Sequence, residues 1–386
     1  MTTGIVCEYN PFHNGHLYQI KKAGAMGADK IVCVMSGNFV QRGECAFFSK
    51  HLRAKAAVMC GADVVIDLPT PWAMASAETF ARGSIGLLQS FGIDALSFGC
   101  ENDDEELLRA CAKMLNDNET GRLIKMYSAD GLSYPEAVSR ALTEGLGEKA
   151  GQLISSPNNT LAVEYIRHLS DNITLLPVKR QGADHDSDTA KDNIASASLI
   201  RNMSLRGEAL GFVPSELVAL YKEAETYSLA YCERAILSSL RLMDKQELSF
   251  YVSDKSGLDM RIYDSLQSAD SLERLYAMAK SKNYTHSRVR REVMNLWLRV
   301  KKEYSEGIPP YMKILAVSER GLSMLSGAKE NSSLPIITKY AEAKSLEGKA
   351  KEIYEAECRN TDLFSLCTEK IKECSSEKKH SLIIVK

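Results

Sequence analysis

This chain of 386 residues lacks the features that would assign it to several common protein classes. No apolar run approaches the about 20 residues that a membrane-spanning helix needs, so we expect no contact with a membrane. The ten cysteines form no Cys-x-x-Cys pair, which argues against a zinc site or a disulfide framework and favours reduced thiols in the cytoplasm. The chain begins almost directly with an expected strand, so we expect no signal peptide.

The chain also lacks an excess of either charge and two familiar nucleotide motifs. Lys and Arg number 48 against 50 Asp and Glu, which excludes a generally basic protein but leaves room for a local basic patch. No Gly-x-x-x-x-Gly-Lys-[Ser/Thr] phosphate loop is present. Residues 145–150 fit Gly-x-Gly-x-x-Ala, but no expected strand precedes them, so they are not a dinucleotide fingerprint.

What the first half does contain is an alternation of short apolar runs with helical patterns. We expect strands at residues 4–8, 30–35, 64–68, 95–98 and 174–178, and helices at 15–25, 50–61, 77–91, 105–116, 161–169 and 196–206. This alternation predicts an α/β fold with a parallel sheet and right-handed crossovers. Ligands of such sheets bind at the carboxyl ends of the strands.

The pattern changes near residue 211, where strand-like runs nearly vanish. Helical stretches such as 230–243 and 287–304 follow, and a break occurs at 307–310. We therefore expect a Rossmann-like parallel-sheet domain over residues 1–210 and a mainly helical domain over 211–386. The charged tail should be loosely held up to the apolar residues 382–385.

Two histidines flank a glycine where the first expected strand gives way to a helix. A helix N-terminus offers unpaired N–H groups and a positive dipole end to a phosphate, and Gly15 permits close approach. His13 and His16 can then stabilise charge that develops during phosphate transfer. Histidine pairs can also bind metals or be chance surface residues, but no Cys or carboxylate cluster lies nearby in sequence. We therefore expect no metal site here.

The segment from Glu8 to His16 resembles a known motif. His-Asn-Gly-His is similar to the phosphate motif of the HIGH nucleotidyltransferase superfamily, and the longer string resembles the bacterial tRNA(Met) cytidine acetate ligases. The resemblance implies that residues 1–210 form the ATP-binding catalytic domain, with His13 and His16 as catalytic residues. The nucleotide site implied here comprises Cys7, Glu8, Tyr9, Asn10, Pro11, Phe12, Asn14 and Gly15.

Residues 196–201 resemble the second motif of the superfamily, Ser-Ser-Thr-x-Ile-Arg. Small hydroxyls at a helix start are phosphate donors, and an arginine one turn later can pair with phosphate bidentately. The resemblance implies that Ser198 and Arg201 close over the departing pyrophosphate. Without the first motif, the same residues would describe an ordinary serine-capped helix with an exposed arginine.

Three further positions match nucleotide contacts of the family. Gly99 ends an expected strand, and its family counterpart contributes backbone to the nucleotide site, although a glycine can also simply end a strand. Asn158 matches the first Asn of a Pro-Asn-Asn stretch, where helix capping is the ordinary role. Arg180 matches a nucleotide-binding arginine. The family has Tyr at the position of Asp184, which leaves His185 without an assigned role.

Two polar stretches have more than one interpretation. The Gly- and Asn-rich loop at 35–43 follows a strand, where ligand contact is common, but it can also be a plain surface loop. Ser49, Lys50 and Arg53 begin a helix and could form a solvated face. The resemblance implies that this second stretch contacts substrate or tRNA.

Residues 284–302 combine basic and aromatic side chains. Such a mixture suits contact with RNA phosphates and stacking on bases, and it is also typical of a solvated helix face. The resemblance to a family that must hold tRNA favours RNA contact. The candidate contacts are Arg288, Arg290 and Arg291.

The resemblance implies an ATP-dependent ligase that converts acetate to acetyl-adenylate and acetylates the wobble cytidine of elongator tRNA(Met) to N4-acetylcytidine. It implies Mg²⁺ with ATP and no acetyl-CoA. One alternative is an adenylyltransferase acting on a phosphorylated small molecule, and another is a catalytically silent RNA-binding protein. Pyrophosphate release separates the three functions. The ligase would release it only with acetate, the adenylyltransferase only with a phosphorylated metabolite, and the silent RNA-binding protein with neither. The sequence leaves the oligomeric state open.

Overall fold

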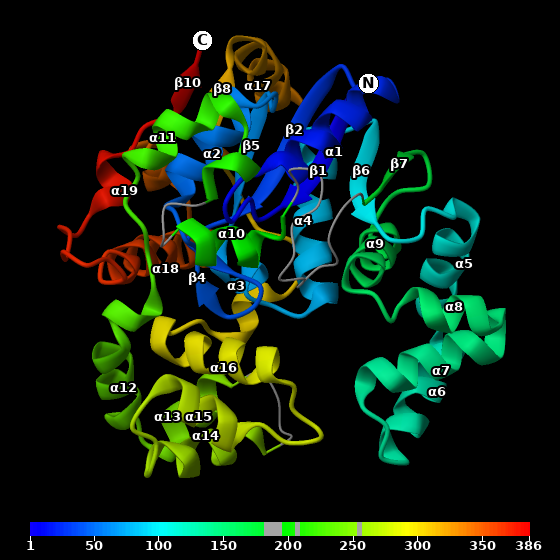
Figure 1. The fold of residues 1–386 in the computed structure, drawn as a ribbon, viewed down its shortest axis with the longest axis vertical. Helices are drawn as coiled ribbons and strands as arrows, with labels where there is room; N and C mark the ends of the chain where they lie inside the picture. Colours follow the sequence, from blue (N-terminus) through cyan, green and yellow to red (C-terminus); the bar gives the residue numbers. More distant parts are fainter. Residues whose placement is uncertain (181–194, 205–208, 253–256) are drawn as a thin grey trace.

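The computed structural model describes residues 1–180, 195–204, 209–252 and 257–386 (Figure 1). Asp184, His185 and the last two residues of the helix expected at 196–206 lie outside these ranges. Among the described helices, none is both long and apolar enough to cross a membrane.

An eight-stranded sheet forms the centre of the molecule, with strand order β10-β8-β5-β2-β1-β6-β7 and β9 paired to β8. Its parallel part consists of β1 (Thr2–Cys7), β2 (Lys30–Ser36), β5 (Val64–Leu68), β6 (Ala95–Cys100) and β7 (Thr174–Lys179). The helices α1 (Asn14–Ala25), α2 (Lys50–Met59), α4 (Ala77–Phe91), α5 (Glu105–Leu115) and α9 (Pro157–Arg167) occur between these strands. The expected α/β fold with a parallel sheet is confirmed.

Both faces of the parallel sheet are covered, which explains why its strands are nearly continuous apolar runs. Along β2, Val32 and Val34 point into one hydrophobic core with α4 and α9. The alternate residues Cys33 and Met35 point into a second core with α1 and α2.

The strand order places a switch point at β1. The chain passes from β1 to β2 and β5 on one side, and later to β6 and β7 on the other side. The connections that leave the carboxyl ends of the strands therefore run in opposite directions on the two sides of β1, and a crevice for ligands is expected there. This is the end at which the His-Asn-Gly-His motif follows the strand.

The second half is mainly helical, as expected, but it also returns three strands to the sheet that were not predicted. β8 (Met312–Ser318) pairs antiparallel with β5, and β9 (Ile336–Ile337) and β10 (Ile383–Val385) pair with β8. The run from Met312 to Val317 is almost wholly buried because β8 lies inside the sheet, between β5 of the first half and β10. The division of the chain at residue 210 stays a prediction.

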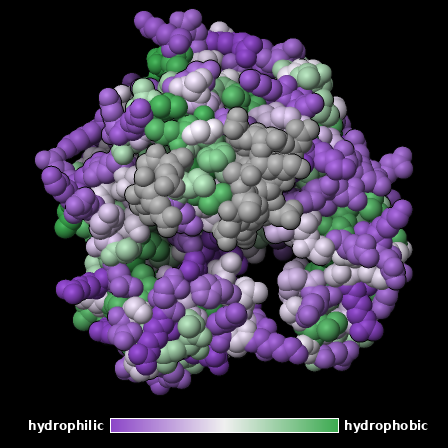
Figure 2. Space-filling view, viewed as in Figure 1, coloured by the Kyte–Doolittle hydropathy of each residue, from purple (hydrophilic) through white to green (hydrophobic). Residues whose placement is uncertain are grey.

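Besides the helices packed on the sheet, two further groups of helices lie below it in the view of Figure 1. We define the helical lobe as α12 (Glu233–Arg241), α13 (Lys245–Tyr251), α14 (Leu258–Leu266), α15 (Leu272–Ala279) and α16 (His286–Leu298). The other group contains α5, α6 (Asn118–Ala129), α7 (Tyr134–Leu146) and α8 (Glu148–Leu153). Figure 2 shows a recess between the two groups and mainly hydrophilic residues on both.

The remaining elements connect these parts. They are β3 (Phe39–Val40), β4 (Glu44–Cys45), α3 (Thr70–Ala73), α10 (Ala197–Ser204), α11 (Val218–Lys222), α17 (Glu319–Asn331), α18 (Gly348–Phe364) and α19 (Ser376–Lys379). β3 and β4 form an antiparallel hairpin outside the main sheet.

Candidate active site

A pocket opens at the carboxyl ends of β1, β6 and β7, next to the start of α1 and to α10. It gathers twelve of the fifteen residues proposed from sequence: Cys7, Glu8, Tyr9, Asn10, His13, Gly15, His16, Gly99, Asn158, Arg180, Ser198 and Arg201. Pro11, Phe12 and Asn14 are outside the lining. Phe12 is fully buried and packs against the ring of Tyr9, and the Asn14 side-chain amide donates to the Gly211 carbonyl at 3.5 Å.

The two motif histidines hold the first turn of α1 through their Nδ1 atoms. The backbone N–H of Gly15 donates to His13 Nδ1 at 3.0 Å, and the backbone N–H of His13 donates to His16 Nδ1 at 3.2 Å. The two rings stack with centroids 3.7 Å apart. Because Nδ1 accepts a hydrogen bond in each ring, a neutral imidazole must carry its hydrogen on Nε2.

Burial keeps both imidazoles neutral. It lowers the pKa of His13 to about 3, and the nearby cations Arg180 and Arg201 act in the same direction. Burial, His13 and Arg180 likewise lower the pKa of His16 well below its usual range. At neutral pH the motif therefore supplies two neutral Nε2–H donors to the pocket without the cost of burying two imidazolium ions.

This lowered pKa predicts a pH dependence of stability. In the unfolded chain His13 has its usual pKa of about 6.5, so below that pH it is protonated, whereas in the folded protein it stays neutral down to about pH 3. The unfolded state therefore binds more protons, and the free energy of unfolding falls as the pH decreases towards 3. At pH 5 this one residue should cost about 2 kcal/mol relative to pH 7.5. Urea unfolding at the two pH values should show a smaller loss for His13→Asn than for the wild type. The control His286→Asn, at the start of α16, should retain the wild-type loss; an unchanged loss in His13→Asn would contradict the prediction.

The second motif lies against the first. One Nη atom of Arg201 donates to the Asn10 carbonyl at 2.8 Å, and the other lies 3.5 Å from Ser198 Oγ. Ser196 Oγ accepts from the N–H of Leu199 at 3.1 Å, so this serine does cap the helix. The helix is thus serine-capped, but Arg201 is not an exposed arginine, because it lines the pocket.

The strand end near Gly99 and the start of α9 form a further part of the wall. Glu101 accepts from the side-chain amide of Asn158 and from the N–H of Asn159. A Cβ atom at Gly99 would meet only Arg180 Cγ, at 3.7 Å. The protein therefore imposes little steric need for glycine at this position, and the missing side chain leaves space in the pocket.

Sequence reasoning missed several lining residues. Leu161 and Tyr165 follow Asn158 at the spacing of one helix face, and this periodicity could have identified them. Glu44 lies just beyond the loop proposed for ligand contact and carried no signal. That loop does contribute Val40, Gln41 and Arg42 to the wall.

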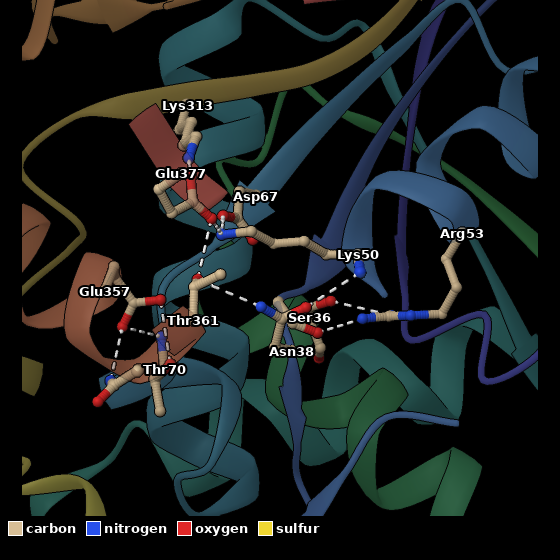
Figure 3. A network of polar contacts seen from close by, with 12 residues as sticks. Ser36, Asn38, Lys50, Arg53, Asp67, Thr70, Lys313, Glu357, Thr361 and Glu377 are labelled. Carbon is tan, nitrogen blue, oxygen red and sulfur yellow. Dashed lines mark hydrogen bonds and ion pairs between the residues drawn. The ribbon is translucent and has the colours of Figure 1, made fainter. Parts of the chain in front are cut away.

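Lys50 and Arg53 are buried, so neither forms a solvated face, and both have partners within the protein (Figure 3). Arg53 donates to the carbonyls of Glu8, Ser36, Gly37 and Phe48. Lys50 Nζ lies 2.8 Å from Asp67 Oδ2 and 2.6 Å from Glu377 Oε1. These contacts fix the ends of β1 and β2 beneath the pocket, while Ser49 caps α2.

All three arginines proposed for RNA also contact protein. Arg290 pairs with Glu44 and, at 2.8 Å, with Glu273 Oε1. Arg291 donates to the Gln41 carbonyl at 3.4 Å. Arg288 lies over the ring of Tyr284, 5.3 Å from its centroid, and stays a candidate for RNA contact.

The comparisons with known proteins agree with this geometry. Residues 1–379 match the HIGH Nucleotidyl Transferase family, which defines the class. The tRNA(Met) cytidine acetate ligase of Acetivibrio thermocellus is 33% identical over 94% of each chain, and that of Thermosipho africanus is 35% identical over 87% of this chain and 84% of its own. The chain belongs to the tRNA(Met) cytidine acetate ligase family.

Solved structures give the same result. Thermotoga maritima TmcAL without ligand superposes with a TM-score of 0.92 at 27% identity, and both chains are fully covered. The same protein bound with alpha-thio ATP gives a TM-score of 0.89 over the same coverage.

Proposed function

We propose that this protein is an ATP-dependent ligase that activates acetate and acetylates the wobble cytidine of elongator tRNA(Met). The observation that carries the proposal is the meeting of both phosphate motifs, through Arg201 and the Asn10 carbonyl, in one pocket of a chain from this family. The ATP-analogue complex of the Thermotoga maritima relative supports ATP as the nucleotide.

In the first step a carboxylate oxygen of acetate attacks the α-phosphorus of ATP. The new oxygen–phosphorus bond forms acetyl-adenylate, and pyrophosphate leaves with the electron pair of the broken phosphoanhydride bond. Negative charge grows on the phosphoryl oxygens and on the leaving group. The neutral N–H donors of His13 and His16, the α1 N-terminus, and the guanidinium groups of Arg180 and Arg201 are placed to stabilise it.

In the second step the N4 amine of the cytidine attacks the acetyl carbonyl carbon. The carbon–nitrogen bond forms, AMP leaves, and the nitrogen loses one proton. No acetyl-CoA enters this scheme. Catalysis of both steps depends mainly on holding the reactants in line.

Mg²⁺ would enter with ATP and neutralise part of its phosphate charge. Among the described residues, no group of three or more His, Cys, Asp or Glu side chains is arranged to hold a metal ion. Mg²⁺ would therefore be bound chiefly by phosphate oxygens, with Glu8 and Glu44 as the carboxylates of the pocket wall. ATP and tRNA substrates agree with a cytoplasmic enzyme.

Arg201→Lys is expected to weaken ATP binding about tenfold. Lysine has a single charged nitrogen and no planar fork, so it loses the geometry in which one Nη holds the Asn10 carbonyl and the other is directed to a phosphate. Equilibrium dialysis with ATP and filter binding with tRNA should show a loss for ATP alone. Arg167→Lys, which alters an arginine paired with Glu164 outside the pocket, is the control. Equal losses for ATP and tRNA would assign Arg201 to the RNA or to the fold.

Exchange of labelled pyrophosphate into ATP tests the first step. The proposal predicts exchange that requires acetate. Exchange that instead requires a phosphorylated metabolite would identify a small-molecule adenylyltransferase. No exchange, together with intact tRNA binding, would identify a catalytically silent RNA-binding protein.

A further inference from the structure

The β3–β4 hairpin has two faces with different surroundings. Phe39 pairs with Cys45 across the hairpin, and Val40 pairs with Glu44. Val40 and Glu44 line the pocket, whereas Phe39 and Cys45 are buried in the hydrophobic core of the helical lobe. Successive side chains of a strand point to opposite faces. The hairpin is therefore a wall of the pocket on one side and a part of the lobe's core on the other.

Aromatic contacts fasten the base of the hairpin to the lobe and to α18. The ring of Phe39 meets Trp297 of α16 edge to face at 6.0 Å, and Phe364 of α18 at 5.9 Å. Such pairs stabilise the contact beyond the burial of the rings alone. The opposite side of the base is held by Asn38, which accepts from the Lys50 N–H and donates to Thr361 (Figure 3).

The tip of the hairpin touches the backbone of α16. Gly43 has a φ of +74°, and a Cβ atom there would lie 2.6 Å from the backbone nitrogen of Arg291. Glycine is required at this position both by the left-handed conformation and by the close approach. The hairpin consequently cannot move far without α16.

Polar contacts continue this connection into the pocket. Arg290 of α16 pairs with Glu44, and its guanidinium lies over the ring of Tyr276 of α15, 5.2 Å from the centroid. Arg291 donates to the Gln41 carbonyl, and the Gln41 N–H donates to Glu8 Oε1 at 2.8 Å. A continuous series of contacts therefore joins the helical lobe to the carboxylate at the end of β1.

We infer that α16 is a structural part of the ATP site, and that Arg290 is a positioning residue that holds the pocket wall through Glu44. This inference rests on the proposed function for its substrate, ATP. It assigns to the lobe a role in the adenylation step itself, in addition to any contact with RNA. Acetate activation should then be sensitive to changes in α16 even when no RNA is present.

The test compares Arg290→Gln with Arg274→Gln in acetate-dependent pyrophosphate exchange without tRNA. Arg274 also lies in the lobe, but its pair with Asp270, which precedes α15, is a surface contact. Small displacements of a positioning element can cost up to about 100-fold in rate. We expect the KM for ATP to rise at least about tenfold in Arg290→Gln, and the Arg274→Gln values to equal those of the wild type.

Thermal unfolding distinguishes a displaced pocket wall from an unfolded protein. Arg290→Gln should melt within a few degrees of the wild type, because the ion pair is partly exposed. Arg290→Lys keeps a cation beside Glu44 and should bring the ATP KM back towards the wild-type value. Arg290→Met also removes the cation and serves if the glutamine variant does not fold. A wild-type KM in a folded Arg290→Gln or Arg290→Met protein would overturn the inference, as would an equal rise in Arg274→Gln.

Measuring ATP binding directly tests the role of Arg290 even if the protein does not catalyse acetate activation. If the wild type shows no acetate-dependent exchange, the proposed function fails, and equilibrium dialysis with ATP still tests the hairpin. Weaker ATP binding by Arg290→Gln alone supports the inference, and equal binding by wild type and both variants overturns it.

Discussion

Replacing His16 by alanine is expected to lower the rate of acetate-dependent pyrophosphate exchange about 10²–10³-fold. His16 lines the pocket with a neutral ring whose Nδ1 is occupied by the His13 N–H, so its Nε2–H is the donor that a phosphate oxygen can use. A preorganised donor of this kind stabilises charge without reorganisation in the transition state. Steady-state exchange over a range of ATP concentrations measures the loss.

The control for this variant must separate chemistry from capping. His16→Ala also removes the acceptor for the His13 N–H, which costs about 1 kcal/mol of stability. Circular dichroism and thermal unfolding should therefore show a folded protein. His168→Ala removes a histidine at the end of α9, outside the pocket lining, and should exchange normally. Near-normal exchange by a folded His16→Ala protein would contradict the assignment.

Lys50→Met should destabilise the protein by about 3–5 kcal/mol. Lys50 is 1% exposed, and its ammonium lies between the carboxylates of Asp67 and Glu377, which are buried as deeply. Without it these two carboxylates lose a shared cation inside the protein, where charge is poorly solvated. Urea unfolding at neutral pH measures the difference in free energy.

The matched control is a lysine in a surface pair. Lys379 and Glu373 lie 2.7 Å apart with both side chains mostly exposed, so Lys379→Met should change stability by less than about 1 kcal/mol. Similar losses for the two lysines would show that the buried network contributes no more than a surface pair. The comparison also tests whether α19, which carries Glu377, is held in place by this network.

The central part of the fold could be predicted from local pattern alone. The bounds expected for the strand 64–68 and the helix 77–91 are those observed, since a buried parallel strand is a continuous apolar run and Ser76 and Gly92 cap the helix. β8 was not predicted because whether an apolar run forms a strand depends on the strand that it can pair with. Its partner β5 lies about 250 residues earlier in the chain, and no local signal specifies that pairing.

The same distinction separates the parts of the site that could be predicted from those that could not. His13, His16 and Arg201 could be proposed for the site because their motifs resemble those of a known superfamily. The burial of Lys50 and the pairing of Arg290 depend on Glu377 and Glu44, which come from distant segments. A charged residue on a helix usually faces solvent, so its burial can be predicted only when the compensating charge is known.

Incubation of the protein with ATP, labelled acetate and total tRNA tests the central claim most directly. The account predicts label in elongator tRNA(Met), on the wobble cytidine, only when both ATP and acetate are present, and in amounts equal to the pyrophosphate released. His16→Ala should lower the rates of labelling and of pyrophosphate release together, by about 10²–10³-fold. Labelled acetyl-CoA, supplied in place of acetate and ATP, should leave the tRNA unlabelled. Pyrophosphate release that does not depend on acetate, with no label in any tRNA, would contradict the account.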